Sequence, residues 1–139
     1  MTAVFCPMRL IASVLAVVAA SFVAGCNGGT VDRHALTKDA ATVDSIACEG
    51  ALLARLVTRD DSVHLFTRVH ADELRLQASN LADALSQRGT VDRIEQRVRA
   101  EGRRAASVAR ELELLHRNPN DHQVSAAVAQ RLEAIGRCR

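Results

Sequence analysis

Aspartate and histidine residues, types that often hold transition metals, gather at two places in this sequence. The first group precedes or opens a predicted helix and consists of Asp60, Asp61 and His64. The second group flanks a predicted turn and consists of His116, Asp121 and His122. An up-and-down arrangement of helices brings both groups to one end of the molecule. Imidazole and carboxylate together suit zinc, copper or nickel, so a metal site made of all members except Asp60 is one interpretation. The structural interpretation is favoured, because aspartate caps helix starts and histidine is favourable near helix ends.

Polar residues also interrupt the apolar stripes of the predicted helices, at His70, Gln77, Glu101 and Arg131. Gln77 and Glu101 lie almost equally far from the Gly89 turn, so antiparallel neighbours would bring them to one level. Facing polar side chains in a bundle core can bind a metal or a small ligand. They can also form a structural layer that fixes register, or be displaced to the edge of the stripe. We favour the structural alternatives.

Three arginines, Arg99, Arg103 and Arg110, fall close together on one predicted helix, opposite its apolar face. Such a basic ridge suits contact with phosphate-bearing lipids or with an acidic partner. The alternative, which is favoured, is a solvated face with pairs inside the helix such as Glu95 with Arg99.

Composition and missing motifs exclude several function classes. The net charge of +2 over 139 residues argues against a nucleic-acid partner, and 2% aromatic residues leave few platforms for bases or sugars. The sequence has no GxSxG, SxxK or HExxH motif and no glycine-rich phosphate loop. We therefore expect no enzyme and no catalytic residues.

The N-terminal segment has the order of an export signal. Arg9 precedes an apolar run from Leu10 to Val23, which is shorter than the roughly 20 residues of a spanning helix. The run ends in Val23-Ala24-Gly25-Cys26, which resembles the lipobox of bacterial lipoproteins. Met8 gives a more compact start than Met1, so we expect initiation at Met8.

The resemblance to bacterial lipoproteins implies cleavage before Cys26 and attachment of diacylglycerol and acyl chains, palmitate among them, to this residue. Residues 1–25 would be the signal peptide, and no other cofactor is expected. More than one acyl chain gives stable membrane anchoring. Because Asn27 is not the aspartate typical of inner-membrane retention, a two-membrane bacterium would place the protein on the periplasmic side of the outer membrane. A one-membrane bacterium would place it on the outer face of the cell membrane.

The remaining cysteines predict a disulfide. With Cys6 in the signal peptide and Cys26 lipidated, Cys48 and Cys138 are left in an exported, oxidising compartment. A metal site is a weak alternative, because neither cysteine has a CxxC or nearby histidine partner.

The elements that must position these residues are four amphipathic helices. Residues 26–37 read as the lipidated cysteine and a flexible tether, and residues 38–139 as the helical domain. Helices are predicted over 38–58, from a cap at Asp60 or Asp61 to Gly89, from Thr90 to 118, and from a cap at Asn120 or Asp121 onward. The predicted stripe of the first helix is Val43, Ile46, Gly50, Leu53 and Val57, widened by Cys48, Leu52 and Leu56. That of the second helix is Val63, Phe66, His70, Leu74, Gln77, Leu81 and Leu85, and that of the third is Val91, Ile94, Val98, Glu101, Ala105, Val108, Leu112 and Leu115. That of the fourth helix is Val124, Val128, Arg131, Leu132, Ile135 and Cys138.

Short connections predict an all-α, up-down-up-down four-helix bundle. A three-helix core with the first helix packed obliquely is the alternative. The two disulfide cysteines then differ in level by roughly 9 Å at 1.5 Å per residue, so the last helix must be offset or Cys138 must lie beyond its end.

The sequence predicts a membrane-anchored envelope lipoprotein whose helical domain is an interaction or structural module. Its partners would be the membrane, through the lipid, and another envelope protein. The alternative is an envelope carrier of a metal or small ligand.

Overall fold

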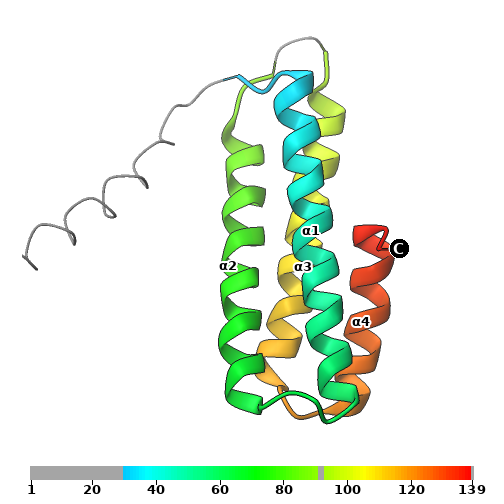
Figure 1. Cartoon of the computed structure of the whole chain (residues 1–139). Coiled ribbons are helices and arrows are strands. Elements are labelled where there is room, and N and C mark those ends of the chain that lie inside the picture. The colour runs from blue at the N-terminus through cyan, green and yellow to red at the C-terminus, as the bar shows by residue number, and fades with distance from the viewer. Residues whose placement is uncertain (1–29, 91–92, 139) are drawn as a thin grey trace, which may run out of the picture.

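The computed structural model describes residues 30–90 and 93–138 as four antiparallel helices, with no strand among these residues. The helices are α1 (Arg33–Thr58), α2 (His64–Gln87), α3 (Glu95–Arg117) and α4 (His122–Gly136), and in the view of Figure 1 they run down, up, down and up. The predicted signal peptide and the lipobox cysteine lie outside the described residues. Within the described residues, no helix combines the length and apolarity required to cross a membrane.

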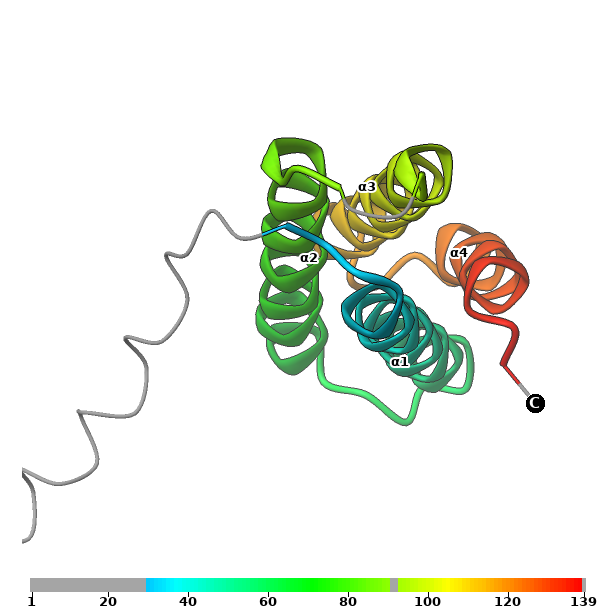
Figure 2. The same cartoon turned by 90° about the horizontal axis from the view of Figure 1, so that it is seen from above.

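The helices form a four-helix bundle in which α2 packs mainly on α3, and α1 mainly on α4. Seen from above, α2 and α4 lie on opposite sides of the bundle (Figure 2). The other diagonal pair, α1 and α3, is in contact through the core. The predicted bundle topology is therefore confirmed.

The core is aliphatic and rich in alanine. Its largest fully buried side chains are four leucines, Leu74, Leu112, Leu115 and Leu132. A second cluster lies where the chain enters the bundle, and it contains Val31, Leu36, Leu85, Ile94 and Val98. The predicted stripe of α3 is buried as expected at its aliphatic positions from Ile94 to Leu115.

The first helix begins at Arg33, earlier than the predicted start at Lys38. The side chain of Asp32 accepts a hydrogen bond from the backbone N–H of Ala35 at 2.7 Å, and this cap fixes the helix start. Leu36 is buried, so the segment assigned to the tether already contributes to the core. The flexible part predicted for residues 26–37 was therefore too long.

Two helix-start predictions were wrong and one is confirmed. Val63, rather than Asp60 or Asp61, precedes α2, and it makes no side-chain cap. Ile94, rather than Thr90, precedes α3. Neither start has a side-chain cap, and in the connection between α2 and α3 Gly89 accepts a hydrogen bond from the N–H of Val31 at 2.8 Å. At α4 the expected cap forms, since Asp121 accepts from the N–H of Val124 at 2.9 Å.

The buried face of α2 is rotated relative to the predicted stripe. Its buried residues are Thr67, Ala71, Leu74, Ala78 and Leu85. Val63, Phe66 and Gln77, predicted to face the core, are exposed, as is Leu52 on α1. Alanines on both α2 and α3 allow these helices to pack closely, and this close packing selects the face with small side chains over the one with Phe66.

Gly50 allows α1 to approach the opposite corner of the bundle. A Cβ atom at this position would lie 2.6 Å from Leu112 Cδ2 and 3.0 Å from Leu132 Cδ1. Glycine is therefore required there for contact between α1 and the leucines of α3 and α4.

Candidate functional site

The predicted disulfide joins Cys48 in the middle of α1 to Cys138 just after α4, with 5.5 Å between the Cα atoms. The expected mismatch in level is resolved because α4 ends at Gly136, part of the way along the bundle, where the C-terminus lies in Figure 1. Arg137 takes a left-handed conformation with φ of 51° and carries Cys138 beyond the helix end. The bridge therefore fixes the short helix to α1.

Arg104 of α3 ties three helices together beside this bridge. Its guanidinium donates to the backbone carbonyl of Ile135 at 3.0 and 2.6 Å, and pairs with Asp44 of α1 and Glu101 of α3. Burial lowers the pKa of Arg104, and the nearby charge of Arg137 lowers it further. Its donation to a carbonyl near the end of α4 satisfies a group that has no partner in the helix. This role could not be predicted from the sequence, because it depends on where α4 ends.

A groove runs along the outer side of the interface between α2 and α3. One hollow of about 760 Å³ is lined by Arg75, Ser79, Ala106, Arg110 and Glu113, among others. A second, of about 400 Å³, is lined by Ala82, Asp83, Arg99, Gly102 and Arg103 and shares Ala106 with the first. Small side chains make the floor, so the groove follows directly from the close packing of the two helices.

The three arginines of the predicted basic ridge form the α3 wall of this groove. Arg99 pairs with Glu95 on its own helix, and Arg110 donates to Ser107 at 2.9 Å. Among residues 30–90 and 93–138, no carboxylate lies within ion-pair distance of Arg103 or Arg110. The pair inside the helix is the one that the favoured alternative, a solvated face, predicts, and Arg103 and Arg110 remain without a carboxylate partner among the described residues.

A surface ion cluster crosses the same interface. Arg75 donates to Asp72 Oδ1 at 2.9 and 2.6 Å and reaches Glu113 of α3 at 3.1 Å. The hydrogen bond from Arg75 lowers the pKa of Asp72, and the same bond raises the pKa of Arg75. This cluster is the polar link between α2 and α3 at the groove.

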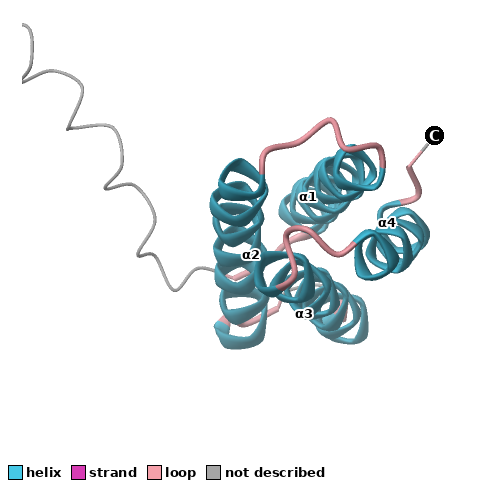
Figure 3. Ribbon diagram, turned by 90° about the horizontal axis from the view of Figure 1, so that it is seen from below, coloured by secondary structure: helices cyan, strands magenta, loops and turns pink. Residues whose placement is uncertain are grey.

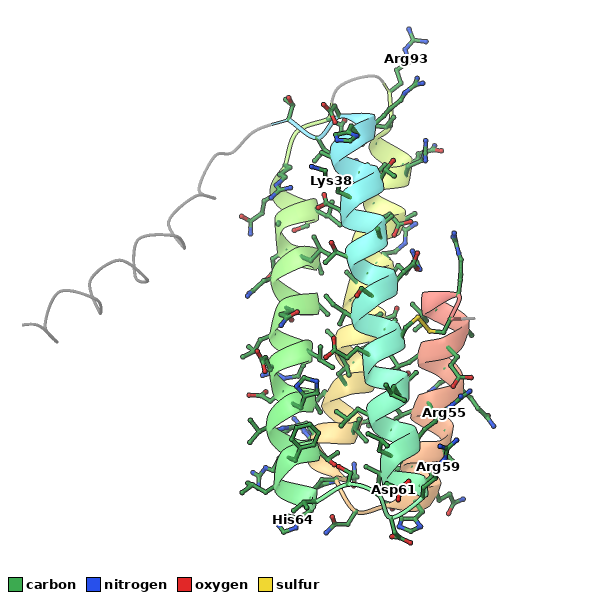
Figure 4. All side chains as sticks on the ribbon, in the orientation of Figure 1. Lys38, Arg55, Arg59, Asp61, His64 and Arg93 are labelled. Carbon is green, nitrogen blue, oxygen red and sulfur yellow. A yellow bond between two sulfur atoms is a disulfide. The ribbon has the colours of Figure 1, made fainter. Side chains whose placement is uncertain are left out.

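The polar end of the bundle gathers only some of the predicted residues. The α1–α2 and α3–α4 loops lie together there (Figure 3). His122 lies 2.9 Å from Asp60, whereas His116 Nδ1 lies 3.0 Å from the carbonyl oxygen of Arg68. Asp61 and His64 are exposed, on different sides of this end (Figure 4). The described residues include no group of three or more His, Cys, Asp or Glu that could hold a metal.

Of the two structural alternatives for the polar residues on the stripes, the structure shows displacement to the edges of the stripes or beyond them rather than a polar layer in the core. His70 bonds Glu49 of α1 at 2.8 Å and is stacked on Phe66. Glu101 pairs with Arg104, and Arg131 with Glu111 at 2.8 Å near the surface. Gln77 is exposed, so it does not share a polar core layer with Glu101, as the polar-layer alternative required.

One Glu-x-x-His pair, Glu113 and His116, also lies on α3. Glu113 is engaged by Arg75 and Arg117, and His116 is held at the Arg68 carbonyl oxygen. A di-metal bundle site needs such a pair on each of two helices together with further inward-facing glutamates. The contacts of this pair are those of a helix surface.

The fold and surface define an all-α, disulfide-closed four-helix bundle with an open basic groove. Comparisons with protein-family models, curated proteins and solved structures found no match to this chain.

Proposed function

We propose that this protein is a membrane-anchored envelope lipoprotein whose helical domain is an interaction module. The proposal combines the lipobox-like sequence ending at Cys26 with a helical domain whose first buried residue, Val31, follows five positions later. The anchor would keep the domain at the membrane, and the domain would present surfaces to neighbours.

The observation that carries the proposal is the position of Val31. Its N–H donates to the carbonyl of Gly89 at 2.8 Å, and its side chain is buried. Only Asn27-Gly28-Gly29-Thr30 separate it from Cys26, a span of at most about 18 Å. A lipid on Cys26 would therefore hold the bundle close to the bilayer by the end that contains the α2–α3 connection.

The surfaces support an interaction role rather than catalysis. Arg103 and Arg110 face an open groove, and α2 carries exposed apolar side chains. Unpaired cations and clustered apolar surface are features of interaction surfaces.

Metabolic labelling tests the anchor. Bacteria that express the full chain are grown with labelled palmitate, and the label is followed on the wild type, Cys26→Ala and Cys6→Ala. We expect the wild type and Cys6→Ala to carry label and to sediment with membranes. Cys26→Ala should carry none, because it lacks the thiol that accepts the lipid. Label on Cys26→Ala, or its loss in Cys6→Ala, would contradict the proposal.

A further inference from the structure

Exposed apolar side chains are concentrated on α2. Of the large apolar residues exposed in the described part of the chain, most lie on this helix or at its cap: Val63, Leu65, Phe66, Val69 and Leu76. Single exposed apolar residues are ordinary on a monomer, whereas several on one helix are a feature of surfaces that contact a partner.

Three of these side chains form a seam on the side of α2 that faces away from the core. Leu65, Val69 and Leu76, with Asp72 between them, are spaced four, three and four residues apart. At about 100° per residue these positions fall within an arc of about 60°, opposite the buried Leu74. This is the a/d spacing of a helix that packs against a second helix. The structure uses only the other face of α2 for contacts with α1 and α3.

We propose that the seam binds the α2 helix of a second copy of this chain in antiparallel orientation. A two-fold axis between His70 and Ala71 places Leu65 of each copy opposite Leu76 of the other. The same axis brings Asp72 of each copy into the space between Leu65, Arg68 and Val69 of its partner. Such a contact is self-complementary, as a two-fold interface requires.

The charged residues beside the seam favour a second copy of the chain as the partner, and they favour the antiparallel orientation of the two helices. Both hydrogen bonds from Arg75 end on Asp72 Oδ1, which leaves Oδ2 as an acceptor for Arg68 of the second copy. A parallel pair would instead place Asp72 against Asp72, which like charges disfavour. A lipid surface is a poorer occupant, because Asp72, Glu73 and Asp83 on this side of α2 would meet anionic head groups.

The seam is small, so pairing depends on confinement. It extends about 17 Å along the helix and buries less than the roughly 1,000 Å² typical of a stable interface. Two copies anchored in one membrane meet at a raised effective concentration, and in this respect the inference rests on the proposed function. With the two-fold axis along the membrane normal, both bundles lie flat and both anchors reach the same surface.

Cysteine crosslinking tests the partner and the register. Full-length Leu65→Cys and Leu76→Cys chains are expressed separately and together, mildly oxidised in membranes, and separated on non-reducing gels. The mixture should give a crosslinked dimer. Each variant alone should not, because in the antiparallel pair its own cysteines are about 17 Å apart and direct disulfides need Cα atoms within about 7 Å.

The same experiment on purified protein at high concentration separates this inference from the anchor. A dimer there, together with absence of palmitate label, would overturn the proposed function alone. Absence of a mixed dimer under both conditions, equal dimer from Leu65→Cys alone, or crosslinking to a different protein would overturn the pairing.

A matched pair of substitutions tests the seam itself in the mixed-cysteine background. Val69 and Leu52 are 60% and 59% exposed, on α2 and α1 respectively. Val69→Glu should reduce the mixed dimer roughly tenfold, because it places a charge in the contact, whereas Leu52→Glu should leave it unchanged. Circular dichroism verifies that both variants are folded. An equal effect of the two substitutions would overturn the assignment to α2.

Discussion

The α1–α4 pair and the α2–α3 pair show two ways of joining antiparallel helices. The first pair is held by the Cys48–Cys138 bridge, and Arg104 of α3 adds hydrogen bonds to the end of α4 and an ion pair to Asp44 of α1 from across the bundle. The second pair is joined by close packing of small side chains, with Arg75 as a polar link on the outside. The first pair is therefore joined by a covalent bond and by hydrogen bonds of fixed geometry, while the second leaves a groove and the apolar seam of α2 open to solvent.

The disulfide should give the largest difference between the two pairs. Replacing both cysteines, Cys48→Ser with Cys138→Ser, should lower the free energy of unfolding by about 4 to 5 kcal/mol, because the bridge closes a loop with a sequence separation of 90. Urea unfolding of the oxidised wild type and of the variant, followed by circular dichroism, measures this loss.

Hydrogen exchange then locates the loss. In the double-serine variant, amides of α4 should lose more protection than amides of α2 and α3, because the bridge fixes α4 to α1 and involves neither α2 nor α3. Equal loss in all helices would mean that the two pairs unfold as one unit, and the comparison would fail.

Most of the fold was predictable because it follows from helical periodicity. The α3 stripe and the Asp121 cap are local patterns, and both were predicted correctly. The face of α2 could not be predicted in the same way. Its alternatives, one with Phe66 and one with Ala71, differ by a small rotation, and close packing against the alanines of α3 decides between them. That information lies in another helix.

Arg104 tests the polar contacts that hold the α1–α4 pair. Arg104→Ala should lower the free energy of unfolding by about 2 kcal/mol, because it leaves the Ile135 carbonyl and Asp44 without their charged donor. Arg99→Ala removes an exposed pair with Glu95 and should change stability by less than about 0.5 kcal/mol. Denaturant unfolding of both variants gives the comparison. Similar values would mean that Arg104 contributes no more than a surface arginine.

Two glycines allow the packing of the two pairs to be compared directly. Gly50→Ala should destabilise the protein by about 1 to 2 kcal/mol, because the new methyl group meets Leu112 and Leu132, with the gain in helix propensity offsetting part of the strain. At Gly102 on α3 the nearest atom to a new Cβ is Leu85 Cβ at 3.6 Å, an ordinary contact. Gly102→Ala should therefore stabilise by up to about 1 kcal/mol. Thermal unfolding measures the stability change of both variants. Destabilisation by Gly102→Ala would show that the α2–α3 interface is packed as closely as the core around Gly50.

The surface sites were predictable only in part, for a related reason. The arginine ridge is a property of one helix, so its spacing alone places Arg99, Arg103 and Arg110 on one face. The groove beside it needs the distance between α2 and α3, and the Arg104 cluster needs the position at which α4 ends. The choice between a polar layer and displacement to the stripe's edge depended on the rotation of α2, which placed Gln77 in solvent.

The smallest expected effect concerns the polar link of the α2–α3 pair. The hydrogen bond from Arg75 lowers the pKa of Asp72 below its ordinary value of 3.8. Since the folded-state pKa is the lower one, the pair stabilises the protein above pH 3.8, and this contribution is lost as the pH falls through the folded-state pKa. Water and salt screen it, so the effect on stability is small. NMR titration of the Asp72 carboxyl should give a pKa that rises toward 3.8 in Arg75→Gln and in high salt. If Arg75→Gln leaves the pKa of Asp72 unchanged, the Arg75–Asp72 pair on α2 is absent in solution, and Arg75 is left with Glu113 of α3 as its ion-pair partner.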